Sequence, residues 1–251
     1  MKNKYYLIIL VVAFVGILAF SWLYFKDETA IIETPKNEVS NTPIDKELPK
    51  PQIKEEPKFV ALPSSYLIKN FPFETQAPNA NWDELHEEAC EEASVILANY
   101  YLKKQKITPE IMDDEIHKMV NWQVKKWGSH KDLTIKETAQ MAKEIYGLKT
   151  DTITISSIED LKREIAEGNP IIVPTAGRRL GNPNFKQPGP VYHMVVVIGY
   201  DNTKIIVQDV GTRKGDHYEY SQTVFYNAIH DWNGDPESIN DGPKRILKIL
   251  D

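Results

Sequence analysis

Three residues of this chain have side chains that could act together as a nucleophilic catalyst: Cys90, His193 and Asp209. A thiolate is a strong nucleophile, an imidazole can take up and return its proton, and a carboxylate can hold the imidazole in one tautomer. Cys90 is the single cysteine of the sequence, which excludes an internal disulfide and a zinc site built from several cysteines. The fold must decide whether the three side chains meet.

His193 and Asp209 lie on two expected strands that are joined by a short turn. Residues 192–200 (YHMVVVIGY) and 204–209 (KIIVQD) are rich in β-branched residues, and the three residues between them suit a tight hairpin loop. If Tyr200 pairs with Lys204, His193 is diagonal to Asp209, and a shift of two residues sets them directly opposite. In either register both side chains lie on one face, so we expect a His–Asp pair.

Cys90 falls early in a helix that we expect over residues 87–104. The positive end of the helix dipole at that position would favour a thiolate. Four glutamates stand close by in the sequence, at positions 87, 88, 91 and 92. Carboxylates beside a sulfur raise its pKa, so a site crowded by these residues would be slow or inactive, whereas glutamates at a helix start also fit ordinary N-terminal charge preference.

The remaining pattern predicts helices first and strands later. Capping residues and terminal glycines bound three further helices, and short apolar runs indicate four strands. The expected helices are 109–127, 134–147 and 156–168, and the expected strands are 170–175, 192–200, 204–209 and 245–250. This order indicates an α+β domain over residues 59–251, with an N-terminal helical half and a C-terminal antiparallel sheet.

Two segments precede that domain. Residues 5–25 carry no charged side chain, follow Lys2 and Lys4, and are long enough for a transmembrane helix, so we expect residues 1–25 to be a membrane anchor with the rest of the chain outside the cytoplasm. A cleaved signal peptide is the alternative, although the run ends in bulky residues rather than small ones. Residues 26–58 contain five prolines and no glycine or aromatic residue, which is typical of an extended linker.

The overall composition narrows the function further. The hydrophobic fraction of 41% and the charged fraction of 26% are those of a globular protein, and the formal charge is −6. An acidic chain without a basic stripe is not expected to bind nucleic acid. His86 and Cys90 could share a helix face as metal ligands do, but no third ligand follows at suitable spacing, so we expect no metal and no cofactor.

Several of these residues resemble one known family. The resemblance runs through Gln76, residues 81–82 (NW), 89–94 (ACEEAS), 189–193 (GPVYH), 199–201 (GYD) and 207–209 (VQD). Together they resemble the double-glycine leader peptidase-like group, which is cysteine peptidase family thirty-nine with its stand-alone relatives, within the papain-like fold. The resemblance implies Cys90 as nucleophile, His193 as general base and Asp209 as the residue that orients it. It also implies an oxyanion donor, here Gln76, although 14 residues separate it from Cys90.

A long loop precedes the expected base. Residues 176–190 are rich in glycine and proline and carry Arg178 and Arg179. Loops of this length are often functional, so we expect the two arginines, together with Trp82, to bind substrate, with a merely exposed loop as the alternative.

The sequence therefore predicts a membrane-anchored, extracytoplasmic thiol protease, a hydrolase that cuts peptide bonds in a peptide or protein substrate through Cys90, His193 and Asp209. Two alternatives remain. One is an inactive peptidase-like module that binds peptides or cell-wall polymers. The other is a cell-wall amidase or transamidase with the same three residues.

Overall fold

The computed structural model describes residues 61–250, which belong to a single compact unit. The expected anchor (1–25) and linker (26–58) lie outside the described residues. Among residues 61–250, no helix has both the length and the apolar character needed to cross a bilayer.

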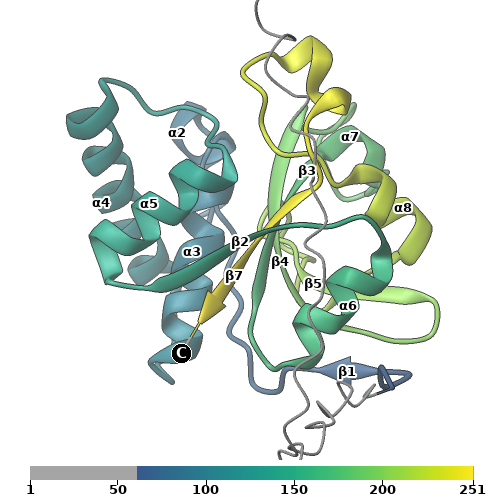
Figure 1. Ribbon diagram of the computed structural model, residues 1–251. Coiled ribbons are helices and arrows are strands. Elements are labelled where there is room, and N and C mark those ends of the chain that lie inside the picture. Colours follow the sequence, from purple (N-terminus) through teal and green to yellow (C-terminus); the bar gives the residue numbers. More distant parts are fainter. Residues whose placement is uncertain (1–60, 251) are drawn as a thin grey trace, which may run out of the picture. The chain divides into compact units, whose positions relative to one another are not determined.

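Seven strands and several helices make up the described chain (Figure 1). In chain order the elements are β1 (Tyr66–Leu67), α2 (Glu84–Glu87), α3 (Cys90–Leu102), α4 (Pro109–Trp127), α5 (Ile135–Tyr146), β2 (Lys149–Thr154), α6 (Ile158–Ala166), β3 (Ile171–Ala176), α7 (Gly177–Leu180), β4 (Tyr192–Tyr200), β5 (Lys204–Gln208), β6 (Tyr218–Ser221), α8 (Gln222–Ala228), η1 (Pro236–Asp241) and β7 (Arg245–Leu250).

One antiparallel sheet separates two groups of helices. Its strand order is β2-β7-β3-β4-β5-β6, and β1 adds to β4. Figure 1 shows α3, α4 and α5 on one face of the sheet and α6, α7 and α8 on the other. The predicted α+β class, with a helical first half and an antiparallel sheet, is therefore confirmed.

The central strand β4 is buried on both faces, which is why its sequence is almost continuously apolar. Tyr192 and Met194 pack into the core that contains α3, whereas Val195 packs into the core that contains α6 and α8. His193 alternates with Met194 and so points to the same side as Val195. Its ring meets Phe185 of that second core edge-on, with ring centroids 5.2 Å apart.

Helix boundaries follow their capping residues. Thr108 caps α4 and Gly128 ends it in the left-handed conformation, as expected from the sequence. Thr134 and Glu137 form the predicted capping box of α5. The single helix expected over 87–104 is wrong at its start, because the chain forms the short helix α2, breaks, and begins α3 at Cys90. Cys90 is thus the first residue of its helix.

The hairpin between β4 and β5 combines two registers. Tyr200 pairs with Ile205 rather than with Lys204, so the register expected at the turn is wrong by one residue. An irregularity between Val197 and Gly199 then shifts the pairing, and Val196 lies opposite Gln208. The shift restores the register in which His193 is diagonal to Asp209, the residue that follows β5.

Candidate active site

The predicted His–Asp pair is present in the structure. His193 Nε2 lies 2.8 Å from Asp209 Oδ1, and both side chains are buried. The other carboxylate oxygen of Asp209 accepts hydrogen bonds from the Tyr220 hydroxyl at 2.5 Å and from Asn182 Nδ2 at 3.1 Å. Burial alone would raise the pKa of Asp209, but the adjoining His193 ring and these hydrogen bonds hold that pKa below its usual value. The carboxylate is therefore kept charged beside the imidazole.

This arrangement determines which nitrogen of His193 can act as a base. With Nε2–H donating to Asp209, the neutral ring has its lone pair on Nδ1. Gly211 leaves room for the ring, because a Cβ atom there would lie 2.7 Å from His193 Cε1. The ring is thus held between Gly211 and Phe185 in one orientation.

Cys90 has a different environment. Its side chain is buried, with 5% of the residue exposed, and Sγ donates to Glu91 Oε2 at 3.0 Å. Burial raises the pKa of Cys90 well above its ordinary value, and the Glu91 and Asp132 carboxyls add to the effect, while the Met194 backbone N–H opposes it. The thiol is protonated at neutral pH in this arrangement.

The structure brings His193 and Asp209 together and leaves Cys90 on a separate hydrogen bond. Cys90 packs in the core that contains Tyr192 and Met194, the two residues that flank His193 on β4. Within residues 61–250 no hydrogen bond joins Cys90 to His193. The thiol therefore lies beside the strand that carries the base, but its proton is directed to Glu91.

His193 borders a cavity of about 740 Å³. The cavity is also lined by Gln76 and Trp82, by the loop 183–190 and by the loop 211–214, whereas Cys90 does not line it. Three cations reach its edge: Lys186, Arg213 and Lys214. The sequence did not single out the last two; their only signal was their position shortly after Asp209.

Two of the expected substrate-binding residues lie elsewhere. Arg178 and Arg179 line a smaller hollow of about 440 Å³ that also involves Pro236 and Glu237. Arg178 Nε donates to the Gly189 carbonyl at 3.3 Å, so this side chain stabilises the loop 183–190 and does not line the main cavity. Trp82, by contrast, borders the main cavity and is 39% exposed.

Gln76 is buried at the cavity and is anchored to the chain that precedes Cys90. Its Nε2 donates to the carbonyls of His86 at 2.8 Å and Glu87 at 3.0 Å, and its backbone N–H donates to Val210. The segment between Gln76 and Cys90 folds back on itself, so Gln76 contacts the residues just before Cys90 although 14 residues separate the two in sequence. Both amide hydrogens of Gln76 are occupied here, so an oxyanion would have to replace those carbonyls.

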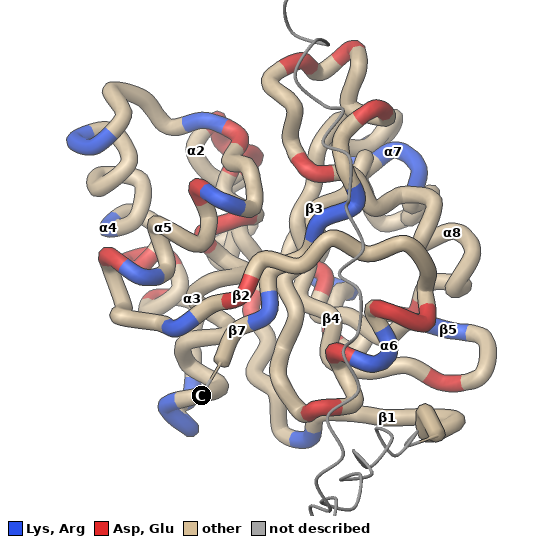
Figure 2. The backbone as a smooth tube through the Cα atoms, in the orientation of Figure 1, with Lys and Arg blue, Asp and Glu red and all other residues tan. Residues whose placement is uncertain are grey.

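Acidic groups crowd the start of α3, and Figure 2 shows acidic positions gathered around α2. Glu92 is buried and contacts Gln123 and His130. Burial raises the pKa of Asp132 to about 6, with Glu88 contributing, and burial likewise raises the pKa of Glu91 well above its ordinary value. Glu91 and Glu92 thus belong to the interior and are not solvent-exposed charges of a helix start.

Comparison with known proteins agrees with this architecture. The model of the peptidase C39-like family matches residues 68–235, a range that includes Gln76, Cys90, His193 and Asp209. The chain belongs to the peptidase C39-like family. A crystal structure from Bacillus anthracis with the provisional description C39-like peptidase matches with a TM-score of 0.50 and 17% identity, covering 74% of this chain and 98% of that one. At 17% identity, this match shows that the two proteins share a fold. The comparison with curated proteins gives no match.

Proposed function

We propose that the domain is a cysteine peptidase in which Cys90 is the nucleophile, His193 the general base and Asp209 the residue that orients the base. Membership of the peptidase C39-like family supports hydrolysis of peptide bonds. The observation that carries the proposal is the 2.8 Å contact between His193 Nε2 and Asp209 Oδ1 at the edge of a cavity large enough for peptide side chains. A nucleophile at the start of a helix and a base on the sheet also fit the papain-like architecture.

The proposed reaction passes through an acyl-enzyme. His193 Nδ1 takes the proton of the Cys90 thiol while the sulfur attacks the carbonyl carbon of the scissile bond. The tetrahedral intermediate collapses to a thioester, and the imidazolium gives its proton to the departing amine. Water, deprotonated by His193, then attacks the thioester and releases the acid and the free thiol.

This reaction requires the thiol to leave Glu91. Met194, whose backbone N–H approaches the sulfur, is adjacent to His193 in the chain, so the thiol is already close to the strand that carries the base. We infer that substrate binding turns Cys90 from Glu91 to His193. Gln76, released from the carbonyls of α2, would then donate to the oxyanion, an interaction worth about a hundredfold or more in rate.

The cavity suggests how a peptide is held. Trp82 offers an exposed apolar surface, and Lys186 and Lys214 offer cations to peptide carbonyls or carboxylates. Arg178 and Arg179 stay as candidates for a more distant part of the substrate, since their hollow is separate from the main one.

An activity-based probe tests the proposal. A peptide carrying an epoxide or vinyl sulfone should label the full chain, and a tryptic digest should place the label on Cys90. Labelling should disappear in Cys90→Ala and fall on the order of 10³-fold or more in His193→Ala. His217→Ala is the matched control, because His217 is an exposed histidine paired with Asp216. Labelling of Cys90 that is unaffected by His193→Ala would contradict the assigned base.

A second function, peptide binding without cleavage, is favoured by one observation: the thiol is protonated, hydrogen-bonded to Glu91 and outside the cavity lining. In that case Cys90→Ala would bind peptides as tightly as the parent, and the parent would leave every peptide of a diverse library uncut. Cleavage that depends on Cys90 would exclude this alternative.

We propose in addition that residues 1–25 anchor the peptidase in a membrane, with the domain outside the cytoplasm. The support is the uncharged run from Tyr5 to Phe25 after Lys2 and Lys4. The full chain should remain with membranes after alkaline carbonate extraction, and protease added to intact cells should reach residues 61–250. Release of the chain by carbonate would contradict the anchor.

A further inference from the structure

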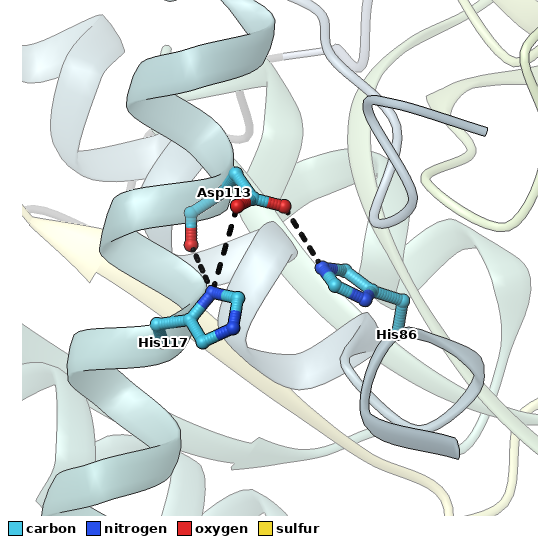
Figure 3. Close-up of side chains that lie close together, drawn as sticks. All are labelled: His86, Asp113 and His117. Carbon is cyan, nitrogen blue, oxygen red and sulfur yellow. Dashed lines mark hydrogen bonds and ion pairs between the residues drawn. The ribbon is translucent and has the colours of Figure 1, made fainter. Parts of the chain in front are cut away.

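A cluster of three side chains on α2 and α4 has the ligand types of a metal site (Figure 3). His86 comes from α2, and Asp113 and His117 come from α4, where they are one turn apart. One potential ligand atom from each residue lies within 4.8 Å of the other two. Figure 3 shows the Asp113 carboxylate between the two imidazole rings.

Each imidazole lies near one oxygen of the Asp113 carboxylate, at a distance close to that between two ligands of one tetrahedral ion. His86 Nε2 lies 3.0 Å from Asp113 Oδ1, and His117 Nδ1 lies 3.7 Å from Asp113 Oδ2. Zinc binds imidazole nitrogen and carboxylate oxygen at about 2.0–2.2 Å, so two ligands of one tetrahedral ion are roughly 3.4 Å apart. The side chain of His117 is 50% exposed and can turn without opening the core. His117 Nδ1 lies 2.9 Å from the Asp113 backbone carbonyl, so the ring must turn from that carbonyl to bind an ion.

A second carboxylate prepares His86 for this role. Asp83 Oδ1 lies 2.7 Å from His86 Nδ1 and also accepts the His86 backbone N–H, which caps α2. A metal-binding histidine usually gives its other ring N–H to a carboxylate in this way, which fixes its orientation. His86 Nε2 lies 3.0 Å from Asp113 Oδ1 and 3.2 Å from Asn81 Nδ2, and a cation between Nε2 and the carboxylate would take the place of a ring proton in joining these two groups.

We propose that His86, Asp113 and His117 bind one Zn²⁺ ion, with water as the fourth ligand. Two imidazoles and one carboxylate suit zinc, whereas Mg²⁺ and Ca²⁺ prefer ligand sets made of oxygen. The sequence expectation of no metal considered His86 only with Cys90. The two further ligands come from α4, which the sequence places more than twenty residues later.

The ion would stabilise α2, the short helix that precedes Cys90 in the chain. His86 holds Gln76 through its backbone carbonyl, and α2 ends shortly before Cys90. Binding of zinc would join this segment to α4. The role is structural, so it does not depend on whether the domain cleaves peptides.

Titration of the full-length, metal-stripped chain with Zn²⁺ tests the site, with Co²⁺ as a spectroscopic substitute. We expect one equivalent to bind, and His117→Ala to weaken binding by at least about tenfold. His217→Ala is the control and should bind like the parent. Cys90→Ala should also bind like the parent, and the Co²⁺ form should lack a thiolate charge-transfer band, which separates this site from binding at the thiol.

Circular dichroism shows whether each variant is folded, and Asp113→Asn provides a second ligand variant in case His117→Ala does not fold. A folded Asp113→Asn chain should also lose affinity, and Zn²⁺ should raise the Tm of the parent but not of His117→Ala. The proposal is overturned if the stripped parent binds no Zn²⁺ at micromolar concentration, or if folded His117→Ala binds as tightly as the parent. Because the experiment works equally in Cys90→Ala, its failure leaves the proposed peptidase activity untouched.

Discussion

Cys90 and Asp209 are both buried, yet their surroundings act on their charges in opposite directions. Asp209 receives hydrogen bonds from His193, Tyr220, Asn182 and the Gly211 backbone, and its pKa is lowered. Cys90 faces a carboxyl group in the interior, and its pKa is raised. The base is therefore prepared for catalysis while the nucleophile is held in its neutral form.

Glu91→Gln should make the Cys90 thiol more reactive. The substitution keeps the size of the side chain and an oxygen for the Leu133 N–H, but it removes the carboxylate that opposes ionisation of the sulfur. The rate of alkylation by iodoacetamide at pH 7–8 should rise several-fold, measured by mass spectrometry of the Cys90 peptide. Glu87→Gln is the control, since Glu87 pairs with Lys186 and its change should leave the rate the same. An unchanged rate in Glu91→Gln would show that burial alone keeps the thiol neutral.

Asp209→Asn should remove activity although it is nearly isosteric. Donors face both oxygens of Asp209, so an amide NH₂ must point at a donor whichever way it turns. We expect peptidase activity to fall on the order of 10³–10⁴-fold. The free energy of unfolding, measured in urea, should decrease by about 1–3 kcal/mol. Asp216→Asn is the matched control, because Asp216 pairs with His217 at the surface. Retained activity in Asp209→Asn would mean that orientation of His193 does not need a carboxylate.

At the level of elements, local signals predicted some parts and missed others. The capping box at Thr134 and the β-branched run of β4 depend on neighbours in sequence, and both elements form where expected. The break between α2 and α3 was missed because it depends on packing: Gln76 binds the last carbonyls of α2 from outside. The polar strand β2 was also missed, since it is an edge strand defined by pairing with β7.

The same distinction applies to the site. The pairing of His193 with Asp209 follows from alternation on two adjacent strands, so the sequence could predict it. The contact between Cys90 and Glu91 joins sequence neighbours, but its consequence depends on burial by other elements. The approach of His117 to His86 depends on how α4 packs and has no local signal.

Thr134→Ala should destabilise the domain through α5. The Thr134 hydroxyl accepts the Glu137 backbone N–H, and the Glu137 carboxylate accepts the Thr134 backbone N–H. Loss of the cap should lower the free energy of unfolding by about 1 kcal/mol, measured in urea. Lys136→Ala, at an exposed position of the same helix, should change stability far less. Equal effects of the two substitutions would show that the capping box adds nothing beyond helix propensity.

At the scale of the whole domain, the sheet separates two hydrophobic cores. The acidic groups with raised pKa values lie near α3, on the side of the core that contains Cys90. Asp132, Glu88 and Glu91 all have raised pKa values; burial is the largest cause for each, and neighbouring carboxyl groups raise the pKa further. Other carboxyl groups, such as Asp209 and Glu137, have lowered pKa values because hydrogen-bond donors face them. Their contribution to stability is complete above their ordinary pKa values of 4.5 for Glu137 and 3.8 for Asp209, and it is lost as the pH falls through their lower pKa values in the folded protein.

Asp132→Asn should therefore change how stability depends on pH between about 4 and 6. The pKa of Asp132 rises from 3.8 to about 6 on folding, so its neutral form is favoured in the folded state. That contribution is fully present below the unfolded pKa and is lost as the pH rises through about 6, which corresponds to about 1–3 kcal/mol. Urea unfolding of the parent should show stability falling across this window, and Asp132→Asn should flatten the fall, while Asp114→Asn, at an exposed position of α4, should not. A parent whose stability rises from pH 4 to pH 6, with Asp132→Asn showing the same rise, would contradict the raised pKa of Asp132.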